Sequence, residues 1–484
     1  MKMLKKSLAL GLSALIAAAS LSACSQSSGA SSAAAPSETA ASSAAEESSE
    51  TSSSGKSEYA GETVYYLNFK PEIADVYKEI AKAFESETGI KLNVVTAASN
   101  TYEQTLRSEL AKSQPPTIFQ INGPVGYNKY KEYCLDLKDT DIYNHLKDKG
   151  LAVTSGSGVY GIPNCVEGYG IICNNAIMKK YFALSDKGSA VTITSADQIK
   201  NFEMLKNVVE DMTKHKSELG IKGVFSSTSF SSGEDWRWQT HLLNMPLFYE
   251  WKGISPDQDP VVTGLAQKEI TLKYGTDYKN IFDLYLNNSV TAKTLLGGKS
   301  VDDSMAEFAT GKSAMVQNGD WAWSQISKVK GNKVTADDIK MMPIYCGAPN
   351  EENYGIPIGT ENFLAVNSKV DEKLQKASIE FLNWLYTSDT GRKYVYSSDK
   401  LGFIAPFDTF SDSERPDDPL AKEVTRWMND SSVKNVNWVY PAFPSQEFKN
   451  AVGAALLKYT QNKTDWNGVT KAVTSSWKSE KAKS

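Results

Sequence analysis

The chain has 484 residues, and at roughly 100 to 200 residues per domain this length predicts two or three compact units rather than one core. Its composition, 41% hydrophobic, 10% aromatic and 23% charged, is that of a globular protein and excludes a fibrous or wholly disordered chain. The net charge of -5 gives no electrostatic basis for binding nucleic acid. The three histidines form no HExxH pattern and no Cys/His cluster, so we expect no metal and no cofactor.

The first 23 residues have the pattern of a secretory signal peptide. Three lysines precede an uncharged apolar run from Leu8 to Leu21, which is shorter than the about 20 residues that a membrane-spanning helix needs. The run ends in Leu21-Ser-Ala-Cys24, which resembles the lipobox at which bacterial lipoproteins are cleaved and lipidated on the cysteine. Two acyl chains on Cys24 are enough for stable anchoring in a membrane. The alternative is an ordinary signal peptide in which Cys24 has no role.

Residues 24–57 form the next segment, for which we expect a disordered tether. After Cys24 it consists almost wholly of Ser, Ala, Glu and Thr, a composition that cannot bury a core. A flexible chain of this length spans roughly 30 Å. We therefore expect the folded part outside the cell, anchored by lipid at the outer face of the cell membrane.

Strand and helix patterns alternate at the start of the folded part. The sequence predicts strands at 64–67, 90–95 and 117–121 and helices at 73–87 and 102–112. Gly89 stands where a glycine commonly ends a helix. This alternation is typical of a parallel α/β sheet, in which ligands bind at the carboxyl ends of the strands. The polar residues at those ends, each of which could instead be a solvated loop residue, are Asn68, Lys70, Glu72, Gln120 and Asn122.

The rest of the chain continues the α/β pattern. Further helices are predicted at 202–215, 281–286, 372–387 and 444–459. After Leu21 no stretch is apolar enough to span a membrane. Beyond Cys24 the cysteines are Cys134, Cys165, Cys173 and Cys346. We expect buried free thiols, although an extracellular protein can also form disulfides.

Several tryptophans lie in polar rather than apolar segments. They are Trp236, Trp238, Trp321, Trp323 and Trp438. A pyranose needs such surroundings, because its C–H face stacks on an aromatic plane while its hydroxyls need carboxylate and amide partners. A buried hydroxyl left unpaired costs about 1 to 3 kcal/mol. Asp320 beside Trp321, and Glu234 beside Trp236, offer this combination, although the indoles could equally fill a core or an interface between lobes.

Three motifs follow one another along the chain. The first is Phe84-Glu-Ser-Glu-Thr-Gly-Ile-Lys-Leu, at a helix-to-strand passage. The second is Tyr160-Gly-Ile-Pro with Glu167. The third runs from Phe308 to Trp323 and contains Asn-Gly-Asp-Trp-Ala-Trp. In this order they resemble motifs of the extracellular solute-binding proteins of bacterial ABC importers, and specifically of their carbohydrate-binding branch, that of maltose-binding protein, in which the second motif lies at a crossover between lobes. The resemblance covers the chain from about residue 59 to residue 477.

The resemblance implies a fold of two α/β lobes with a hinge and a ligand cleft between them. Lobe 1 would comprise residues 58–166 and 355–404, and lobe 2 would comprise residues 167–354 and 405–484. The chain would cross between the lobes near Glu167, Gly355 and Ala405.

The resemblance also implies which residues bind the ligand. Trp321 corresponds to the main stacking platform, Glu167 to the hydroxyl-binding carboxylate at the crossover, and Glu234 with Trp236 to a paired carboxylate and aromatic. The other candidates are Asp320, Asn68, Lys70, Glu72, Asn122, Glu361, Asn362, Trp238, Trp438 and Phe403. The sequence departs from maltose-binding protein at Gln120 and Gly123, so maltodextrin is not the expected ligand.

The function implied is that of a monomeric, lipid-anchored receptor that binds an oligosaccharide and delivers it to the membrane permease of an ABC importer, without catalysis. Two alternatives remain open. The same fold could bind a polyamine, an iron complex or a peptide, since a polyamine site also uses carboxylates and aromatics. A secreted glycoside hydrolase would need two carboxylates about 5 to 10 Å apart, a role open to Glu167 and Glu234.

Overall fold

The computed structural model describes residues 56–483 apart from 99–100, 228 and 231–232. Cys24, the signal segment and nearly all of the expected tether lie outside the described residues. None of the described helices combines the length and apolar character that crossing a membrane requires. All four cysteines in the described part are buried free thiols, which confirms the expectation for them.

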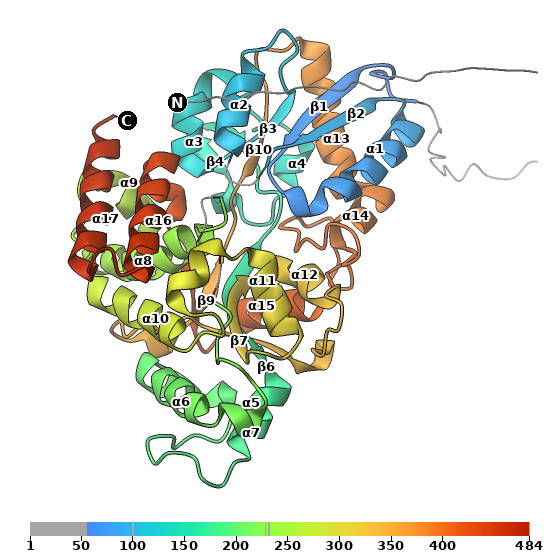
Figure 1. Cartoon of the computed structure of the whole chain (residues 1–484). Helices are drawn as coiled ribbons and strands as arrows, with labels where there is room; N and C mark the ends of the chain where they lie inside the picture. Colours follow the sequence, from blue (N-terminus) through green and yellow to red (C-terminus); the bar gives the residue numbers. More distant parts are fainter. Residues whose placement is uncertain (1–55, 99–100, 228, 231–232, 484) are drawn as a thin grey trace, which may run out of the picture. The chain divides into compact units, whose positions relative to one another are not determined.

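The first sheet has the strand order β10-β3-β1-β2 (Figure 1). Its strands are β1 (Thr63–Asn68), β2 (Lys91–Thr96), β3 (Ile118–Ile121) and β10 (Phe363–Val366). β1 is parallel to β2 and to β3, as predicted, whereas β10 runs antiparallel to β3. The carboxyl ends of β1 and β3 therefore meet at one edge, where the Phe69 amide donates to Gln120 Oε1 at 2.7 Å.

Helices cover this sheet. They are α1 (Ala74–Thr88), α2 (Tyr102–Leu110), α3 (Gly123–Tyr130), α4 (Asp141–Asn144), α13 (Glu372–Thr387) and α14 (Asp389–Tyr396), with a β4 (Val153–Ser155) and β5 (Gly158–Gly161) hairpin. α1 ends at Gly89, whose φ of 78° suits a glycine, as predicted. The Phe381 ring of α13 packs 5.1 Å from Phe84 and 6.5 Å from Tyr66. Aromatic packing thus holds α1 and α13 against the sheet.

The second sheet is built around a fully buried central strand. Its strands are β6 (Glu167–Asn174), β7 (Met315–Gly319), β8 (Ile339–Met342), β9 (Tyr354–Gly359) and β11 (Lys434–Asn437). β6 is antiparallel to β7, β8 and β9, and only the β11–β9 pair is parallel. This sheet is therefore mixed rather than parallel. Because β9 belongs to it, the chain returns to the first sheet after Gly359, a few residues beyond the crossing expected near Gly355.

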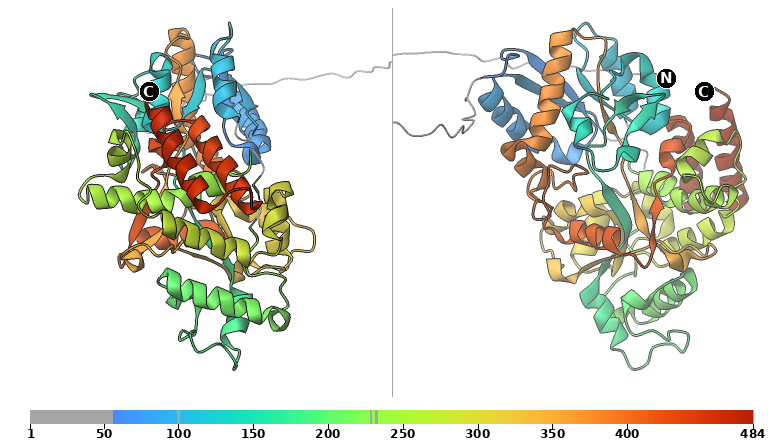
Figure 2. Two further views of the ribbon diagram at one scale, coloured as in Figure 1. Left: turned by 60° about the vertical axis from the view of Figure 1, so that its left-hand side comes forward. Right: turned by 180° about the vertical axis from the view of Figure 1, so that it is seen from behind.

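Helices also surround the second sheet. They are α5 (Asn175–Phe182), α6 (Phe202–Lys214), α7 (Lys216–Leu219), α8 (Leu243–Ile254), α9 (Pro260–Ala266), α10 (Gly275–Asn287), α11 (Val301–Ala309), α12 (Trp323–Ser327), α15 (Pro419–Asn429), α16 (Gln446–Thr460) and α17 (Trp466–Lys481). The helix predicted at 281–286 begins earlier, at Gly275. α16 and α17 lie side by side (Figure 2), and the Phe448 ring packs 5.3 Å from Trp477. Phe448 is thus a core residue.

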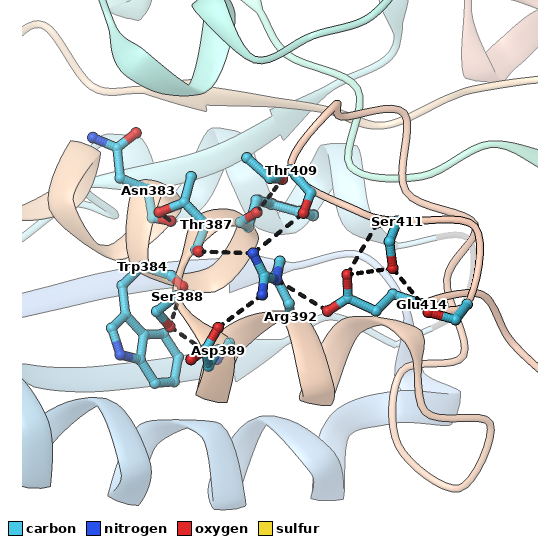
Figure 3. A network of polar contacts seen from close by, with 12 residues as sticks. Asn383, Trp384, Thr387, Ser388, Asp389, Arg392, Thr409, Ser411 and Glu414 are labelled. Atoms are coloured by element: carbon cyan, nitrogen blue, oxygen red, sulfur yellow. Dashed lines mark hydrogen bonds and ion pairs between the residues drawn. The ribbon is translucent and has the colours of Figure 1, made fainter.

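Arg392 forms hydrogen bonds and an ion pair with the segment that leads from α14 back to the second sheet (Figure 3). Its Nη1 donates to the carbonyl oxygens of Thr387 at 3.5 Å and Thr409 at 3.2 Å. Its Nε lies 3.2 Å from a carboxylate oxygen of Glu414, which also accepts from the Ser411 amide. One guanidinium therefore joins the corner between α13 and α14 to residues 409–414.

Replacing this guanidinium should destabilise the protein. We expect Arg392→Met to lower the free energy of unfolding by about 1.5 to 3 kcal/mol, the range for hydrogen bonds to a charged group. Urea unfolding measures this loss. The matched control is Arg415→Met, which removes a pair with the fully exposed Asp412 carboxylate and should leave stability unchanged. Equal effects of the two substitutions would contradict the role given to Arg392.

Candidate functional site

A cavity of about 500 Å³ lies at the edge where β1 and β3 end and β6 begins. Its wall includes residues that follow strands of both sheets, and its members include residues 69–72, 120–122, 167, 233–234, 236–237, 239–241, 321, 361–362, 443–446 and 449. The volume lies in the range of about 300 to 1,000 Å³ that is common for small-molecule sites. The carboxyl ends of the parallel strands β1 and β3 face this cavity. This is the edge of the sheet at which the sequence predicts ligand binding.

Two indoles and an imidazole form an aromatic wall of the cavity. The Trp236 and Trp321 rings are 5.8 Å apart at an interplanar angle of 51°, and both are partly exposed. His241 lies 4.9 Å from Trp236 and 5.5 Å from Trp321. Trp321 Nε1 donates to Asn318 Oδ1 at 2.9 Å, and the ring lies over Gly319, where a Cβ would come within 2.2 Å of it. The Trp321 ring is thus held in one orientation while one part remains open to the cavity.

Two of the predicted tryptophans are core residues and not part of the wall. Trp238 stacks on Phe230 at 4.9 Å with an interplanar angle of 5°, inside the main core. Trp438 is buried behind His241, at 6.1 Å from it. Trp236 precedes the π-helical turn over Arg237–Leu242 and Trp238 lies within it, and positions two apart on a helical turn point to opposite sides. We correct both assignments from ligand contact to core packing.

Lys70 and Glu167 form a buried ion pair in the cavity wall. Lys70 Nζ lies 2.7 Å from Glu167 Oε1, and both side chains are less than a tenth exposed. Burial alone disfavours the ammonium, but the carboxylates of Glu167 and Glu72 outweigh it and raise the Lys70 pKa well above its ordinary value. The carboxylate of Glu167 is therefore engaged by Lys70, which the sequence could not indicate.

Asn68 positions Lys70 and does not line the cavity. Its Nδ2 donates to the Lys70 carbonyl oxygen at 2.8 Å, and its Oδ1 accepts from the Lys70 amide at 3.1 Å. The side chain is 1% exposed. The predicted ligand contact is thus corrected to a turn that orients Lys70.

Asp320 and Phe403 line a second cavity, of about 410 Å³, rather than the first. Lys70, Glu72, Glu167 and Trp321 line both cavities, so the buried ion pair lies between them. Burial, with Glu167 close by, raises the Asp320 pKa well above its ordinary value. Because Asp320 lines only the second cavity, it is not among the residues that line the first one.

Glu234 reaches the N-terminus of α11. Its carboxylate accepts from the Val301 amide at 2.6 Å and from Ser229 Oγ at 2.9 Å. A carboxylate is stabilised there by the unpaired amides and the helix dipole. Glu234 lines the cavity, and one of its carboxylate oxygens is already bonded within the protein.

Five buried polar atoms of the first cavity's wall have no hydrogen-bond partner among the described residues. They are Asn122 Oδ1, Arg237 Nη1, Gln239 Nε2, Gln325 Oε1 and Asn362 Nδ2. A buried polar group without a partner costs about 1 to 3 kcal/mol. The residues that line the cavity therefore include five amide or guanidinium side chains with a buried polar atom that is unpaired within the described part of the chain.

Sequence reasoning named only Asn122 and Asn362 among these five residues. Arg237 lies between the two tryptophans of the Trp-Arg-Trp motif, which drew attention to its indoles alone. His241 and Lys449 also line the cavity and were not named. A helical pattern over 444–459 predicts the helix that carries Lys449 but not which of its faces meets the cavity.

Away from the cavity, Asp186, His215 and Glu218 could each bring one ligand atom within 4.8 Å of the others. His215 already faces Glu218 at 3.4 Å and Asp211 at 3.9 Å. Asp186 and Glu218 are exposed. We assign no metal to this group, because nothing beyond the proximity of the three side chains points to one.

A sequence profile described as bacterial extracellular solute-binding protein matches residues 79–423. Among solved structures, a chitin oligosaccharide binding protein has a TM-score of 0.66 at 18% identity, covering 87% of this chain and 98% of that chain. The solute-binding protein RafE in complex with raffinose has a TM-score of 0.63 at 17% identity, covering 87% and 99%. A sugar transporter protein of Bacillus licheniformis in complex with stachyose has a TM-score of 0.61 at 16% identity, covering 86% and 100%. These likenesses show a shared two-lobe fold.

Proposed function

The chain belongs to the bacterial extracellular solute-binding proteins, and from this membership we propose that it binds an oligosaccharide and delivers it to the permease of an ABC importer. The members of this family are binding proteins rather than enzymes, so no residue is given a catalytic role. One observation carries the choice of ligand: the partly exposed Trp236 and Trp321 rings line the same cavity as five polar side chains, each with a buried atom that has no partner among the described residues.

A sugar fits this wall because it combines apolar faces with many hydroxyls. The partly exposed indoles can stack on pyranose C–H faces. The unpartnered amide, carbonyl and guanidinium groups can pair with ring hydroxyls and so recover the cost of their burial. Raffinose and stachyose, the ligands of two structural neighbours, are oligosaccharides and support the same class.

The state of the carboxylates argues against the two alternatives. A polyamine would need free carboxylates, yet two of those in the wall are engaged, since Glu167 pairs with Lys70 and Glu234 accepts a hydrogen bond at the start of α11. A glycoside hydrolase would need one of these two groups as an acid and the other as a base or nucleophile. Both are already occupied by the protein itself, so the cavity suits binding without bond cleavage.

A melting-temperature screen across neutral glycans, acidic glycans, amines and peptides tests the proposed function. A ligand that binds only the folded state stabilises it, by about 2.7 kcal/mol at a hundredfold excess over its Kd. We expect at least one oligosaccharide to raise the melting temperature and to be recovered intact after prolonged incubation. A response confined to amines or peptides would overturn the proposal.

We further propose that Cys24 carries a lipid that holds the receptor at the outer face of the membrane. Cys24→Ser should then release the protein into the medium, because two acyl chains are what provides stable anchoring. Fractionation of cells and medium measures this. Glycan affinity should be unchanged, since every residue proposed to bind the glycan lies within residues 56–483. Retention of the variant on the membrane would contradict lipid anchoring.

A further inference from the structure

The second cavity, of about 410 Å³, adjoins the first one at the Lys70–Glu167 pair. Lys70, Glu72, Glu167 and Trp321 line both cavities. In Figure 1, α16, which borders the first cavity, lies at the left, and α12, which borders the second, lies well to the right of it. The two cavities are therefore adjoining parts of one elongated cleft, with the Trp321 indole where they meet.

The wall of the second cavity has an apolar part. Val76 comes from the start of α1, Leu401 and Phe403 come from the segment after α14, and Trp323 comes from α12. Trp323 is partly exposed, whereas Phe403 is almost fully buried. An indole with an exposed part can stack on the C–H face of a pyranose. The second cavity thus has its own candidate platform, two positions along the chain from Trp321.

Asp320 is the buried acceptor of this cavity. The residue is 9% exposed, and its one hydrogen bond within the described residues is a long one, from the Gly168 amide to Oδ1 at 3.4 Å. Its Oδ2 accepts no hydrogen bond there and is not among the unpartnered atoms that are sealed from solvent, so it opens onto the cavity that the residue lines. Burial, with Glu167 close by, raises the Asp320 pKa well above its ordinary value. A group that donates to Oδ2 therefore stabilises the carboxylate.

The neighbouring charged groups of the second cavity already have partners within the protein. The Asp418 carboxylate accepts from two amides of α15, each at 3.0 Å. Lys400 Nζ lies 2.8 Å from a carboxylate oxygen of Glu79. The ammonium groups of Lys70 and Lys400 also line this cavity and disfavour a cationic ligand. A neutral hydroxyl is the donor that suits Asp320 in these surroundings.

We propose that the second cavity is a sugar subsite, which takes the end of an oligosaccharide whose other units lie in the first cavity. This inference rests on the proposed function and adds the length of its ligand. The glycan passes from one cavity to the other over the Trp321 indole. In the second cavity a sugar hydroxyl donates to Asp320 Oδ2, and the C–H face of a sugar unit stacks on Trp323. A short glycan occupies the first cavity alone and binds more weakly.

Calorimetric titration with glycans of graded length tests this inference. The probes are chito-, xylo- and malto-oligosaccharides, each from the disaccharide to the hexasaccharide. In a series that binds, we expect the hexasaccharide to bind at least tenfold tighter than the disaccharide. Trp323→Ala and Asp320→Ala should each remove most of this gain and leave the disaccharide affinity unchanged. Trp466→Ala, which truncates a partly exposed indole outside both cavities, should preserve the gain.

A substitution that fills the second cavity gives an independent test. Ser324 is partly exposed and lines this cavity from α12. Ser324→Trp should therefore lower the hexasaccharide affinity to that of the disaccharide without truncating an indole. The matched control is Ser475→Trp, which adds the same bulk at an exposed position of α17 outside both cavities and should change neither affinity. If Trp323→Ala fails to fold, Ser324→Trp decides.

The outcomes separate this inference from the proposed function. Equal affinity of the wild type for all lengths would overturn the second subsite and leave the oligosaccharide receptor standing. Losses in the Trp323, Asp320 and Ser324 variants that are the same at every length would do so too. Binding of none of the glycans would overturn both proposals.

Discussion

Trp321→Ala should weaken glycan binding by about a hundredfold, which corresponds to about 2.7 kcal/mol. Stacking contributes about 0.5 to 1.5 kcal/mol beyond the burial of apolar area, and the lost area supplies the rest. Calorimetric titration with the best-bound oligosaccharide measures the loss. The effect on stability should be small, because the ring is partly exposed and its single hydrogen bond is to Asn318.

Trp466→Ala is the matched control for this substitution. Trp466 is also a partly exposed indole whose Nε1 makes one hydrogen bond, to the Gly275 carbonyl oxygen at 2.9 Å, but it lies on α17 outside the cavity. This variant should lose stability without losing glycan affinity. Truncation of a fully buried indole such as Trp251 should cost about 3 to 5 kcal/mol. If Trp321→Ala unfolds as easily as a Trp251 variant yet binds normally, Trp321 is a core residue.

Glu167→Gln should destabilise the protein by about 3 to 5 kcal/mol, because removing one partner leaves the buried Lys70 ammonium without its main counter-charge. Glu72, at 3.8 Å, compensates only in part because its side chain is 29% exposed. The loss should appear in urea unfolding near pH 7. It should also loosen the contact between the loop after β1 and the start of β6, which this pair bridges.

A double substitution tests whether the loss of stability in Glu167→Gln comes from the unpaired charge that remains on Lys70. Lys70→Met combined with Glu167→Gln should recover part of the stability lost in Glu167→Gln alone, since it removes the uncompensated charge. The exposed pair of Asp75 and Lys78 gives the control, and Asp75→Asn should leave stability unchanged. A cost of Glu167→Gln no larger than that of Asp75→Asn would contradict the account of the buried pair.

The regular elements were predictable because their signals are local. The alternation from Val64 onward, and Gly89 at the end of α1, gave strand and helix bounds that the structure confirms to within two residues. The motifs from Phe308 to Trp323 were among those that predicted the solute-binding family, and the family profile that matches residues 79–423 agrees with that prediction. The mixed second sheet was not predictable, because nothing local to β6 reveals that three of its partners arrive from the opposite direction.

The site was predictable in its location but only partly in its residues. Glu167 is named by its motif, yet its pairing with Lys70 joins positions 97 residues apart, which no local pattern encodes. Trp236 and Trp238 have almost the same sequence surroundings, yet they lie two positions apart at a helical turn and point to opposite sides, so that one is a wall residue and the other a core residue. Arg237 was not predicted to line the cavity, because a basic residue between two indoles is usually expected to be exposed to solvent.

The central claim is that this cavity binds an oligosaccharide on its indole wall. The most direct measurement is a calorimetric titration of the protein with the oligosaccharide that most raises its melting temperature, repeated on Trp321→Ala and Trp466→Ala. We expect one-to-one binding by the wild type and the Trp466 variant, with about hundredfold weaker binding by the Trp321 variant. Equal affinity in all three proteins would place the ligand elsewhere and contradict the claim.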